Sequence, residues 1–163
     1  MAKQRIKPKV ILIGYKSFLQ QNAYLYFSKK KYSVKKLKYT NTKNYKFKNN
    51  DIIVNFSNHK KFYYGNYSKN IDRNYNLAKK VEKSGSTFVL ISTRQIYEPK
   101  MNIKETSRIK PLNNYAKNCL KSEIKCKQIL KNNLLIIRLS NIIGLEKGKK
   151  KKSSLMSLII AGI

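Results

Sequence analysis

Hydroxyl and thiol side chains stand in two segments of the chain where they could act on a substrate. Ser92 and Thr93 end the apolar run TFVLIST, and Tyr115 lies four residues before Cys119 in NNYAKNCLKSE. A hydroxyl that emerges from a buried strand can polarise a carbonyl group or donate to an alkoxide. The alternative is structural: Ser and Thr at a strand end commonly satisfy backbone groups, and a single tyrosine packs its ring while its hydroxyl contacts water.

The elements that must position these side chains follow from hydrophobic patterning. Short runs of branched apolar residues predict buried strands, and apolar residues at helical spacing predict helices between them. Strands that alternate with helices indicate βαβ units, hence an α/β fold with a Rossmann-like doubly wound parallel sheet and helices on both faces. The expected strands cover residues 10–14, 32–37 (the weakest), 51–57, 87–92 and 134–139, and the expected helices cover 17–27, 72–83 and 112–130.

Ligands of such a sheet bind beyond the carboxyl ends of the strands, near the point where the strand order reverses. The first strand is followed by GYKSFLQ, where a dinucleotide fingerprint would place three glycines. Only Gly14 is a glycine, and Ser17 and Gln20 occupy the other two positions. Ser17 can offer a hydroxyl and a helix N-terminus to a phosphate, whereas Gln20 is hard to accommodate where the helix should pack tightly on the strand. Taken alone, Gly14 is a turn residue.

Four segments together resemble the extended short-chain dehydrogenase/reductase family, the NAD-dependent epimerases/dehydratases. Within it the chain is most similar to sugar-nucleotide reductases of the dTDP-4-dehydrorhamnose reductase type. The resemblance covers the chain from Lys9 onward, in the family's order and near its spacing. It depends on DIIVNFSNH, on ISTRQIY with the following ETS, on KPLNNYAKNCLKSE and on IIRLSNIIG.

The resemblance implies roles for individual residues. The family's active-site Ser/Thr matches Thr93, with Ser92 beside it, and its catalytic tyrosine matches Tyr115. In the family this tyrosine is the general acid or base toward a sugar carbonyl or hydroxyl while hydride passes to or from a nicotinamide. Cofactor contacts are implied for Gly14, Ser17 and Gln20 in the dinucleotide loop, for Phe56, Ser57 and Asn58 along the cofactor, and for Ser140 and Asn141 near the nicotinamide and substrate.

One departure from the family falls on a functional position. The family carries a lysine four residues after the tyrosine, on the same helical face, where its ammonium holds the nicotinamide ribose and favours ionised tyrosine. Cys119 occupies this position. Lys117 and Lys121 lie about 160° and 120° away around the helix, so neither replaces it. Arg94 and Gln95 stand where the dehydratase branch carries acidic residues, which argues against dehydration.

Composition leaves two interpretations of the charge open. The chain has 37 basic and 7 acidic residues, a net charge of +30, which suits a polyanion-binding module. However, the lysines are spread over every segment, as in compositional drift, so we expect no specific nucleic-acid partner. Two cysteines and one histidine provide neither a disulfide framework nor a zinc site, and we expect no metal and a reducing cytoplasm. No signal peptide or membrane span is recognisable.

The expected organisation is one NAD(P)-binding domain over residues 1–163, with a basic loop at 145–153 and a substrate-binding region that is largely absent. The expected function is an NAD(P)-dependent reductase or epimerase for a nucleotide-activated sugar, as in polysaccharide synthesis, either weakly active or a fragment. The alternative is a catalytically inactive nucleotide-binding or scaffold domain. NAD and NADP both stay open, although the second strand ends without an acidic residue and its lysines tolerate a 2′-phosphate. Homodimer formation is also left open.

Overall fold

The fold is built on a five-stranded parallel sheet with the strand order β2-β1-β3-β4-β5. The computed structural model describes residues 8–140 and 142. All five expected strands are present, and the last has the predicted bounds. They are β1 (Val10–Ile13), β2 (Val34–Leu37), β3 (Ile52–Asn55), β4 (Thr87–Thr93) and β5 (Leu134–Leu139). The expected doubly wound parallel sheet is therefore confirmed.

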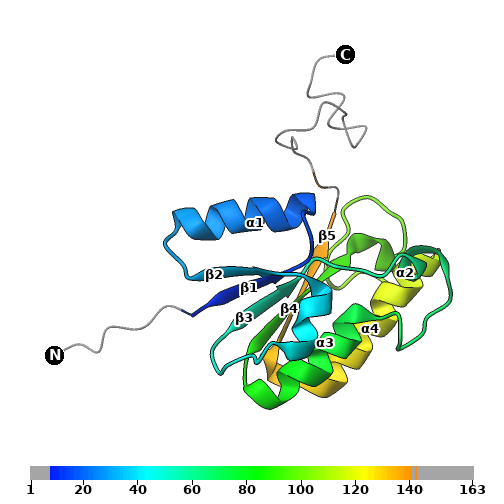
Figure 1. Cartoon of the computed structure of the whole chain (residues 1–163). Helices are drawn as coiled ribbons and strands as arrows, with labels where there is room; N and C mark the ends of the chain where they lie inside the picture. The colour runs from blue at the N-terminus through cyan, green and yellow to red at the C-terminus, as the bar shows by residue number, and fades with distance from the viewer. Residues whose placement is uncertain (1–7, 141, 143–163) are drawn as a thin grey trace.

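Helices cover both faces of this sheet, as expected. Figure 1 shows α1 (Phe18–Lys29) alone on one face, and α3 (Arg73–Val81) and α4 (Asn114–Leu130) together on the other. Side chains alternate along a strand, so β1 contributes side chains to a hydrophobic core on each face of the sheet. Val10 and Leu12 pack on the α1 side, whereas Ile11 and Ile13 pack on the side of α3 and α4. A strand buried on both faces explains the continuous apolar run.

Polar side chains fix where the three long helices begin. Ser17, Asp72 and Asn113 are the N-caps of α1, α3 and α4, and each side-chain oxygen accepts a hydrogen bond from a backbone N–H three residues later. Such bonds satisfy donors that have no partner within the helix. The predicted cap at Ser17 is confirmed. A 3₁₀-helix (Glu82–Ser84) follows α3 and ends at Gly85, the predicted stop, whose φ of +68° is a conformation that favours glycine.

Two connections contain more structure than the sequence analysis expected. The segment HKKFYYGNYSKN, taken as a loop, contains a short helix, α2 (Lys61–Tyr64). The polar connection between β2 and β3 contains a 3₁₀-helix (Tyr39–Asn44). Three aromatic residues of this connection, Tyr39, Tyr45 and Phe47, pack on the core under α3 and α4. These aromatic rings thus extend the core on that side of the sheet.

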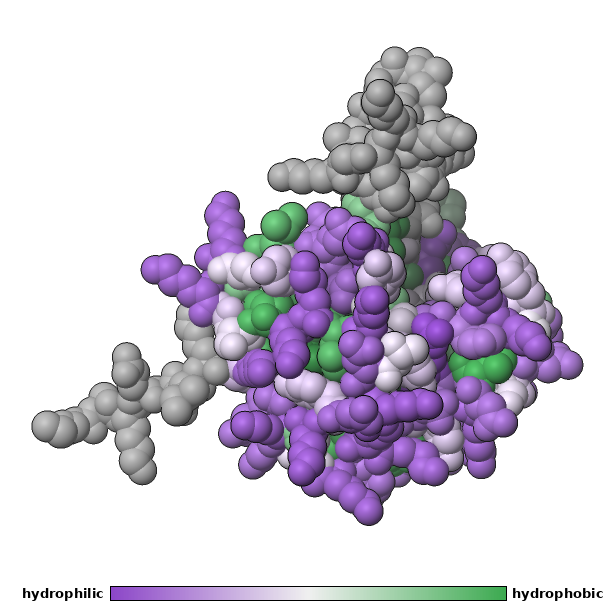
Figure 2. Space-filling model, in the orientation of Figure 1, coloured by the Kyte–Doolittle hydropathy of each residue, from purple (hydrophilic) through white to green (hydrophobic). Residues whose placement is uncertain are grey.

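The two edges of the sheet differ in character. The β2 edge carries Lys35 and Lys36, whose charges oppose pairing with another strand. On β5, Leu135 and Ile137 pair in register with Val89 and Ile91, yet their exposed fractions are 52% and 37%. The described part of the chain thus leaves an apolar face of β5 uncovered, while hydrophilic side chains cover most of the face seen in Figure 2. None of the helices in the described ranges is long and apolar enough to cross a membrane.

Candidate functional site

The strand order reverses between β1 and β3, and the loops that follow these two strands meet there. Phe56 N–H donates to the carbonyl of Ile13 at 2.8 Å. Gly14 has a φ of +156°, and a Cβ added to it would lie 3.4 Å from the Cβ of Phe56. This φ is one that glycine adopts more readily than other residues, and any side chain placed here would contact Phe56. In doubly wound sheets such a switch point is where ligands bind.

A cavity of about 330 Å³ opens beyond the carboxyl ends of β3, β4 and β5. Parallel strands present their carboxyl ends at one edge of the sheet, so residues far apart in sequence meet in this cavity. Six of the predicted site residues line it together: Phe56, Asn58, Ser92, Thr93, Tyr115 and Ser140.

The hydroxyls of Ser92 and Thr93 have different partners. Ser92 Oγ donates to the buried carboxylate of Glu123, so its proton is already engaged. Thr93 Oγ1 accepts from the backbone N–H of Gln95 at 3.3 Å. Because Thr93 is the acceptor in this bond, its own O–H proton is not used there. The structural interpretation thus suits Ser92, whose hydroxyl is bonded to Glu123. The chemical interpretation suits Thr93, whose O–H can donate to a ligand in the cavity.

The ring of Tyr115 is held between aromatic neighbours in the first turn of α4. It stacks on Tyr63 with ring centroids 5.1 Å apart and an interplanar angle of 20°, and it meets the edge of Phe62 at 6.5 Å. Asn118 fixes this arrangement, because its Nδ2 donates to the carbonyls of Phe62 and Gly65, both at 2.9 Å. The α2 segment is therefore tied to α4, and Tyr63 lies over Tyr115.

Cys119 lies beneath the tyrosine in an apolar cluster. Its exposed fraction is 4%, and it packs with Phe62, Ile96 and Tyr97. Burial raises the pKa of the Cys119 thiol to about 12. Burial, followed by the adjacent Cys119, also raises the pKa of the Tyr115 phenol above its ordinary value of 10.0. Both groups are therefore protonated at neutral pH. An ammonium beside the tyrosine would have the opposite effect and would lower the pKa of the phenol.

The two lysines nearest to Tyr115 on α4 do not take the place of the missing one. The ammonium of Lys121 lies 5.7 Å from the ring centroid of Tyr67, away from the cavity. Lys117 is exposed to solvent, and neither lysine is among the described residues that line the cavity. The structure thus agrees with the angular argument from the helix.

A second cavity, of about 440 Å³, lies at the carboxyl ends of β1 and β2, and Gly14 and Gln20 line it. Gln20 is 2% exposed, and its Nε2 donates to the carbonyl of Leu12 at 3.0 Å. The side chain that was expected to disturb helix packing is thus buried against β1, and its amide nitrogen donates to a backbone carbonyl. Ser17 caps α1 by accepting from Gln20 N–H at 3.3 Å. The turn after β1, the start of α1 and this cavity thus lie together at the carboxyl end of β1.

Two predicted cofactor-binding residues, Ser17 and Ser57, do not line these two cavities. Ser57 donates its hydroxyl to Asn55 Oδ1 at 2.7 Å and is not among the lining residues. Asn141 and the predicted basic loop over residues 145–153 lie outside the described residues. Tyr63 is a site residue that the sequence analysis missed, because nothing in HKKFYYG indicates contact with a helix far along the chain.

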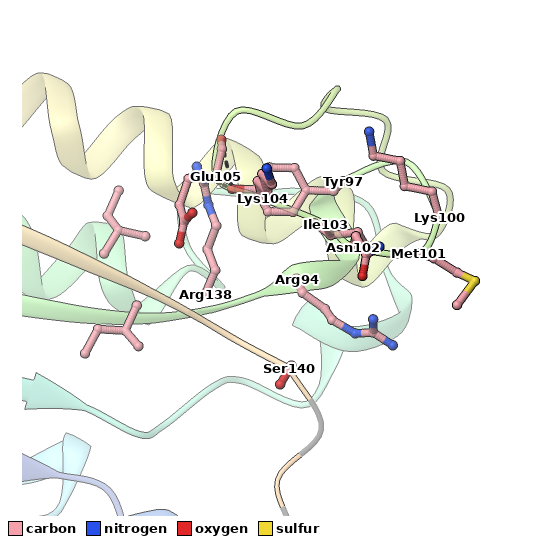
Figure 3. A pocket seen from close by; sticks show the side chains of 12 residues that line it. Arg94, Tyr97, Lys100, Met101, Asn102, Ile103, Lys104, Glu105, Arg138 and Ser140 are labelled. Carbon is pink, nitrogen blue, oxygen red and sulfur yellow. Dashed lines mark hydrogen bonds between the residues drawn. The ribbon is translucent and has the colours of Figure 1, made fainter.

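A third cavity, of about 800 Å³, lies beside β5 and was not predicted. Figure 3 shows Arg138 extending from β5 toward Tyr97 and Lys104, with Ser140 at the end of the strand. The guanidinium of Arg138 donates to Glu123 through Nε and Nη2, with the shortest distance 2.6 Å, and also to the hydroxyl of Tyr97. Its charge is thus neutralised within the protein. In the ranges described, no group of three or more His, Cys, Asp or Glu side chains is placed to hold a metal ion.

Comparison with known proteins gives the family. The model of the NAD dependent epimerase/dehydratase family matches residues 29–163. The chain belongs to this family. The matched residues begin after Gly14, Ser17 and Gln20, so the loop that departs most from the glycine fingerprint lies outside the match. Among curated proteins none matches the chain.

Several solved structures share the fold of the chain. A dTDP-4-dehydrorhamnose reductase from Yersinia enterocolitica has a TM-score of 0.68 at 19% identity, with 95% of this chain and 59% of that chain covered. The reductase of the same name from Bacillus anthracis, in complex with NADP, has a TM-score of 0.63 at 17% identity, with coverage of 81% and 53%. A UDP-glucuronic acid 4-epimerase from Bacillus cereus, in complex with NAD, has a TM-score of 0.59 at 13% identity, with coverage of 80% and 56%.

At these identities the likeness concerns the fold. The chain spans a little more than half the length of these structures. The parallel sheet is thus the feature that the chain shares with these structures. The two positions where the sequence analysis placed departures from the family, Cys119 and Gln20, are both buried.

Proposed function

We propose that the protein binds a nicotinamide dinucleotide across the β1/β3 switch point and reduces the carbonyl group of a nucleotide-activated sugar. The observation that carries this proposal is the cavity in which Thr93 and Tyr115 face the loop of Phe56 and Asn58. Membership of the NAD dependent epimerase/dehydratase family supports the cofactor class. The sugar-nucleotide names of the similar structures support the substrate class.

The chain's own residues divide the binding of the cofactor between two cavities. The turn at Gly14 and the N-terminus of α1, capped by Ser17, would hold the pyrophosphate, because backbone N–H groups and the helix dipole attract anions there. Phe56, Asn58 and Ser140 would lie along the nicotinamide half. When bound, NAD(P) supplies or accepts the hydride.

The protonation state of Tyr115 favours reduction over oxidation. Its pKa is raised, so the neutral phenol predominates and can donate a proton to an oxygen that becomes an alkoxide. Oxidation, which is also the first half of an epimerisation, needs a base at this place, and a phenol with a raised pKa is a poor one. Thr93 can donate its O–H to the same oxygen.

The test begins with binding. The purified chain should bind NADH or NADPH with millimolar or tighter affinity in a fluorescence titration, and Gly14→Val should abolish binding, because the new side chain meets Phe56 and a φ of +156° is unfavourable. With dinucleotide present, a 4-keto sugar nucleotide should be reduced slowly, and Tyr115→Phe should remove this turnover while leaving binding unchanged. Absence of dinucleotide binding at any accessible concentration would overturn the proposal.

A second candidate function is supported by Cys119. The thiol gives no positive charge to Tyr115, so a nucleotide-binding or scaffold domain without catalysis is a specific alternative. Binding of NAD(P)H without turnover, in both the natural chain and a Cys119→Lys variant, would favour this alternative.

For both candidate functions we propose a cytoplasmic protein of polysaccharide synthesis. In the reducing cytoplasm Cys119 and Cys126 would stay as buried free thiols.

A further inference from the structure

Tyr63 places an exposed aromatic ring directly on the proton donor of the proposed reaction. It belongs to the short helix α2, and its ring stacks on that of Tyr115, with centroids 5.1 Å apart and an interplanar angle of 20°. Both rings line the cavity that also contains Thr93. Because Tyr63 is 42% exposed, it contributes little to the buried core. Its place over Tyr115 therefore points to a role in the site.

Two aromatic neighbours hold the ring of Tyr115 in different geometries. Tyr63 lies against its face, and Phe62 makes a T-shaped contact with ring centroids 6.5 Å apart and an interplanar angle of 78°. Stacked and T-shaped arrangements are the two that the charge distribution of aromatic rings favours. A ring fixed by both contacts has few orientations open to it, so its hydroxyl has a defined place in the cavity.

The helix that carries Tyr115 also holds Tyr63 in place. The amide of Asn118, which is 2% exposed, donates to the carbonyls of Phe62 and Gly65 on either side of Tyr63, both at 2.9 Å. These bonds place α2 beside α4, as Figure 1 shows. The stack is thus formed before a ligand arrives, which lowers the entropy lost when a substrate is held against the phenol.

Cys119 supplies no charge that could orient the phenol. Burial raises the pKa of this thiol to about 12, so it stays protonated, and a neutral thiol is a weak hydrogen-bond partner. A proton donor must still lie within about 3 Å of the oxygen that receives the proton. Of the two aromatic rings that contact Tyr115 in the described part of the chain, only Tyr63 lines the cavity.

We infer that Tyr63 is a positioning residue for Tyr115: its stacked ring holds the phenol in the orientation from which the proton passes to the substrate oxygen. This inference rests on the proposed function, because it requires a reduction in which Tyr115 is the donor. Tyr63 itself moves no proton and acts through the ring of Tyr115. An aromatic pair of this kind is strong enough to change a rate by about 2- to 10-fold.

The test measures kcat and KM of the full chain for the reduction of a 4-keto sugar nucleotide by NADH or NADPH. Tyr63→Leu keeps an apolar side chain but removes the ring, so kcat should fall by about 2- to 10-fold. KM and the affinity for the dinucleotide should stay within about twofold, because the lost contact orients a group and does not bind substrate. Tyr63→Phe keeps the stack and should keep kcat within about twofold. An equal fall of kcat in both variants would assign the effect to the Tyr63 hydroxyl and overturn the inference.

The matched control is the same substitution in the next residue. Tyr64 is 83% exposed, is not among the described residues that line the cavity, and meets the ring of Tyr63 at a tilt with centroids 6.2 Å apart. Tyr64→Leu should leave kcat within about twofold of the natural chain. A fall as large as that in Tyr63→Leu would show that the loss of any ring from α2 has this effect, and would overturn the inference.

A second readout needs no turnover. In NMR spectra of the full chain with isotope-labelled tyrosine rings, the signal of Tyr115 is the one that Tyr115→Phe removes. A stacked ring shields the ring protons of its neighbour, so this signal should move in Tyr63→Leu and stay in place in Tyr63→Phe and Tyr64→Leu. An unchanged signal in Tyr63→Leu would show that Tyr63 does not hold the ring, and would also overturn the inference.

The failures of the two proposals are distinguishable. If the natural chain reduces the substrate, and Tyr63→Leu displaces the Tyr115 signal but keeps kcat, the positioning role is wrong and the proposed function stands. If the natural chain binds no dinucleotide, or binds it without turnover, the proposed reduction fails and the positioning role fails with it. A fall of kcat in Tyr63→Leu but not in Tyr63→Phe or Tyr64→Leu, with KM unchanged and the Tyr115 signal displaced, supports the inference directly.

Discussion

Glu123 and Arg138 form a bidentate ion pair between α4 and β5, with Arg138 Nη2 2.6 Å from Glu123 Oε2 and Arg138 Nε 3.1 Å from Glu123 Oε1. The carboxylate also accepts from Ser92 at the end of β4. The side chain of Glu123 is 4% exposed, whereas that of Arg138 is 26% exposed. One buried carboxylate thus joins three elements directly beneath the candidate site.

Because the two partners differ in exposure, their removal should have unequal effects. Arg138→Met leaves a buried carboxylate without its counter-charge and should lower the free energy of unfolding by about 3 kcal/mol. Glu123→Gln leaves a guanidinium that water can reach and should cost about 1 kcal/mol. Urea unfolding followed by circular dichroism measures both values.

The double variant Glu123→Gln/Arg138→Met is the control for this prediction. With neither charge present, its loss of stability should be smaller than the sum of the single losses, because residues in one hydrogen-bond network are coupled. Equal costs for the two single variants, or strict additivity, would show that the pair acts as a surface salt bridge of little net effect.

Cys119 gives the most direct test of how far the site has departed from its family. Cys119→Lys would place an ammonium near the Tyr115 hydroxyl, which should lower the pKa of Tyr115 by about 1–3 pH units. The phenolate absorbance of Cys119→Lys minus that of Tyr115→Phe/Cys119→Lys isolates this titration from the other tyrosines. If the site is a reductase that lacks only its lysine, reduction of a 4-keto sugar nucleotide should rise in parallel.

The matched variant is Cys119→Met, whose side chain has nearly the length of lysine without its charge. Both substitutions enlarge a side chain packed with Phe62, Ile96 and Tyr97, so both should cost about 1–3 kcal/mol from overpacking. Only the lysine variant should change the titration of Tyr115. The same shift in both variants would mean that repacking, and not charge, controls the phenol.

The sequence predicted those parts of the fold whose signals are local. The bounds of β5 were predicted as they are observed, because LLIIRL is apolar except for Arg138, and the cap at Ser17 was predicted. The start of α4 was predicted two residues early, at Leu112, whereas the helix begins at Asn114 after its cap, Asn113. The helix α2 was missed because its four residues have little intrinsic stability. Two side chains of α4 hold this short helix in place. Asn114 donates to the carbonyl of Tyr64, and Asn118 donates to the carbonyls of Phe62 and Gly65.

The candidate site was predictable to the extent that topology alone assembles it. Thr93 ends β4, Phe56 and Ser140 directly follow β3 and β5, and the parallel sheet brings the three to one edge. The stack of Tyr63 on Tyr115 was not predictable, because it depends on the tie between α2 and α4. Likewise, the sequence offered lysines on β2 but could not show which of them face a cavity.

Gln20 occupies a glycine position of the dinucleotide fingerprint, and we expect the hydrogen bond of its buried amide to stabilise the fold. Gln20→Leu keeps the buried volume but removes the donor to the Leu12 carbonyl, and should lower the free energy of unfolding by about 1–3 kcal/mol. The control is Gln21→Leu on the adjacent exposed position, which should stay within about 0.5 kcal/mol of the natural chain. Equal effects in thermal unfolding would contradict the importance of the buried amide.

Asp72 couples stability to pH in a direction opposite to that of most carboxylates. It is fully buried at the start of α3, and burial raises its pKa above the ordinary 3.8, although Tyr67, Tyr75 and Ser122 donate hydrogen bonds to it. A carboxyl whose folded pKa is raised contributes stability that is present below pH 3.8 and is lost as the pH rises through the folded pKa.

Asp72→Asn should therefore remove this loss, because asparagine keeps the capping oxygen without a charge. The unfolding free energy of the variant minus that of the natural chain should rise between pH 3.8 and the folded pKa and then stay constant. Glu98→Gln should give the opposite slope, because hydrogen bonding to Lys110 lowers the pKa of Glu98. Urea unfolding at several pH values distinguishes the two, and a flat or falling difference for Asp72→Asn would mean that its hydrogen bonds outweigh burial.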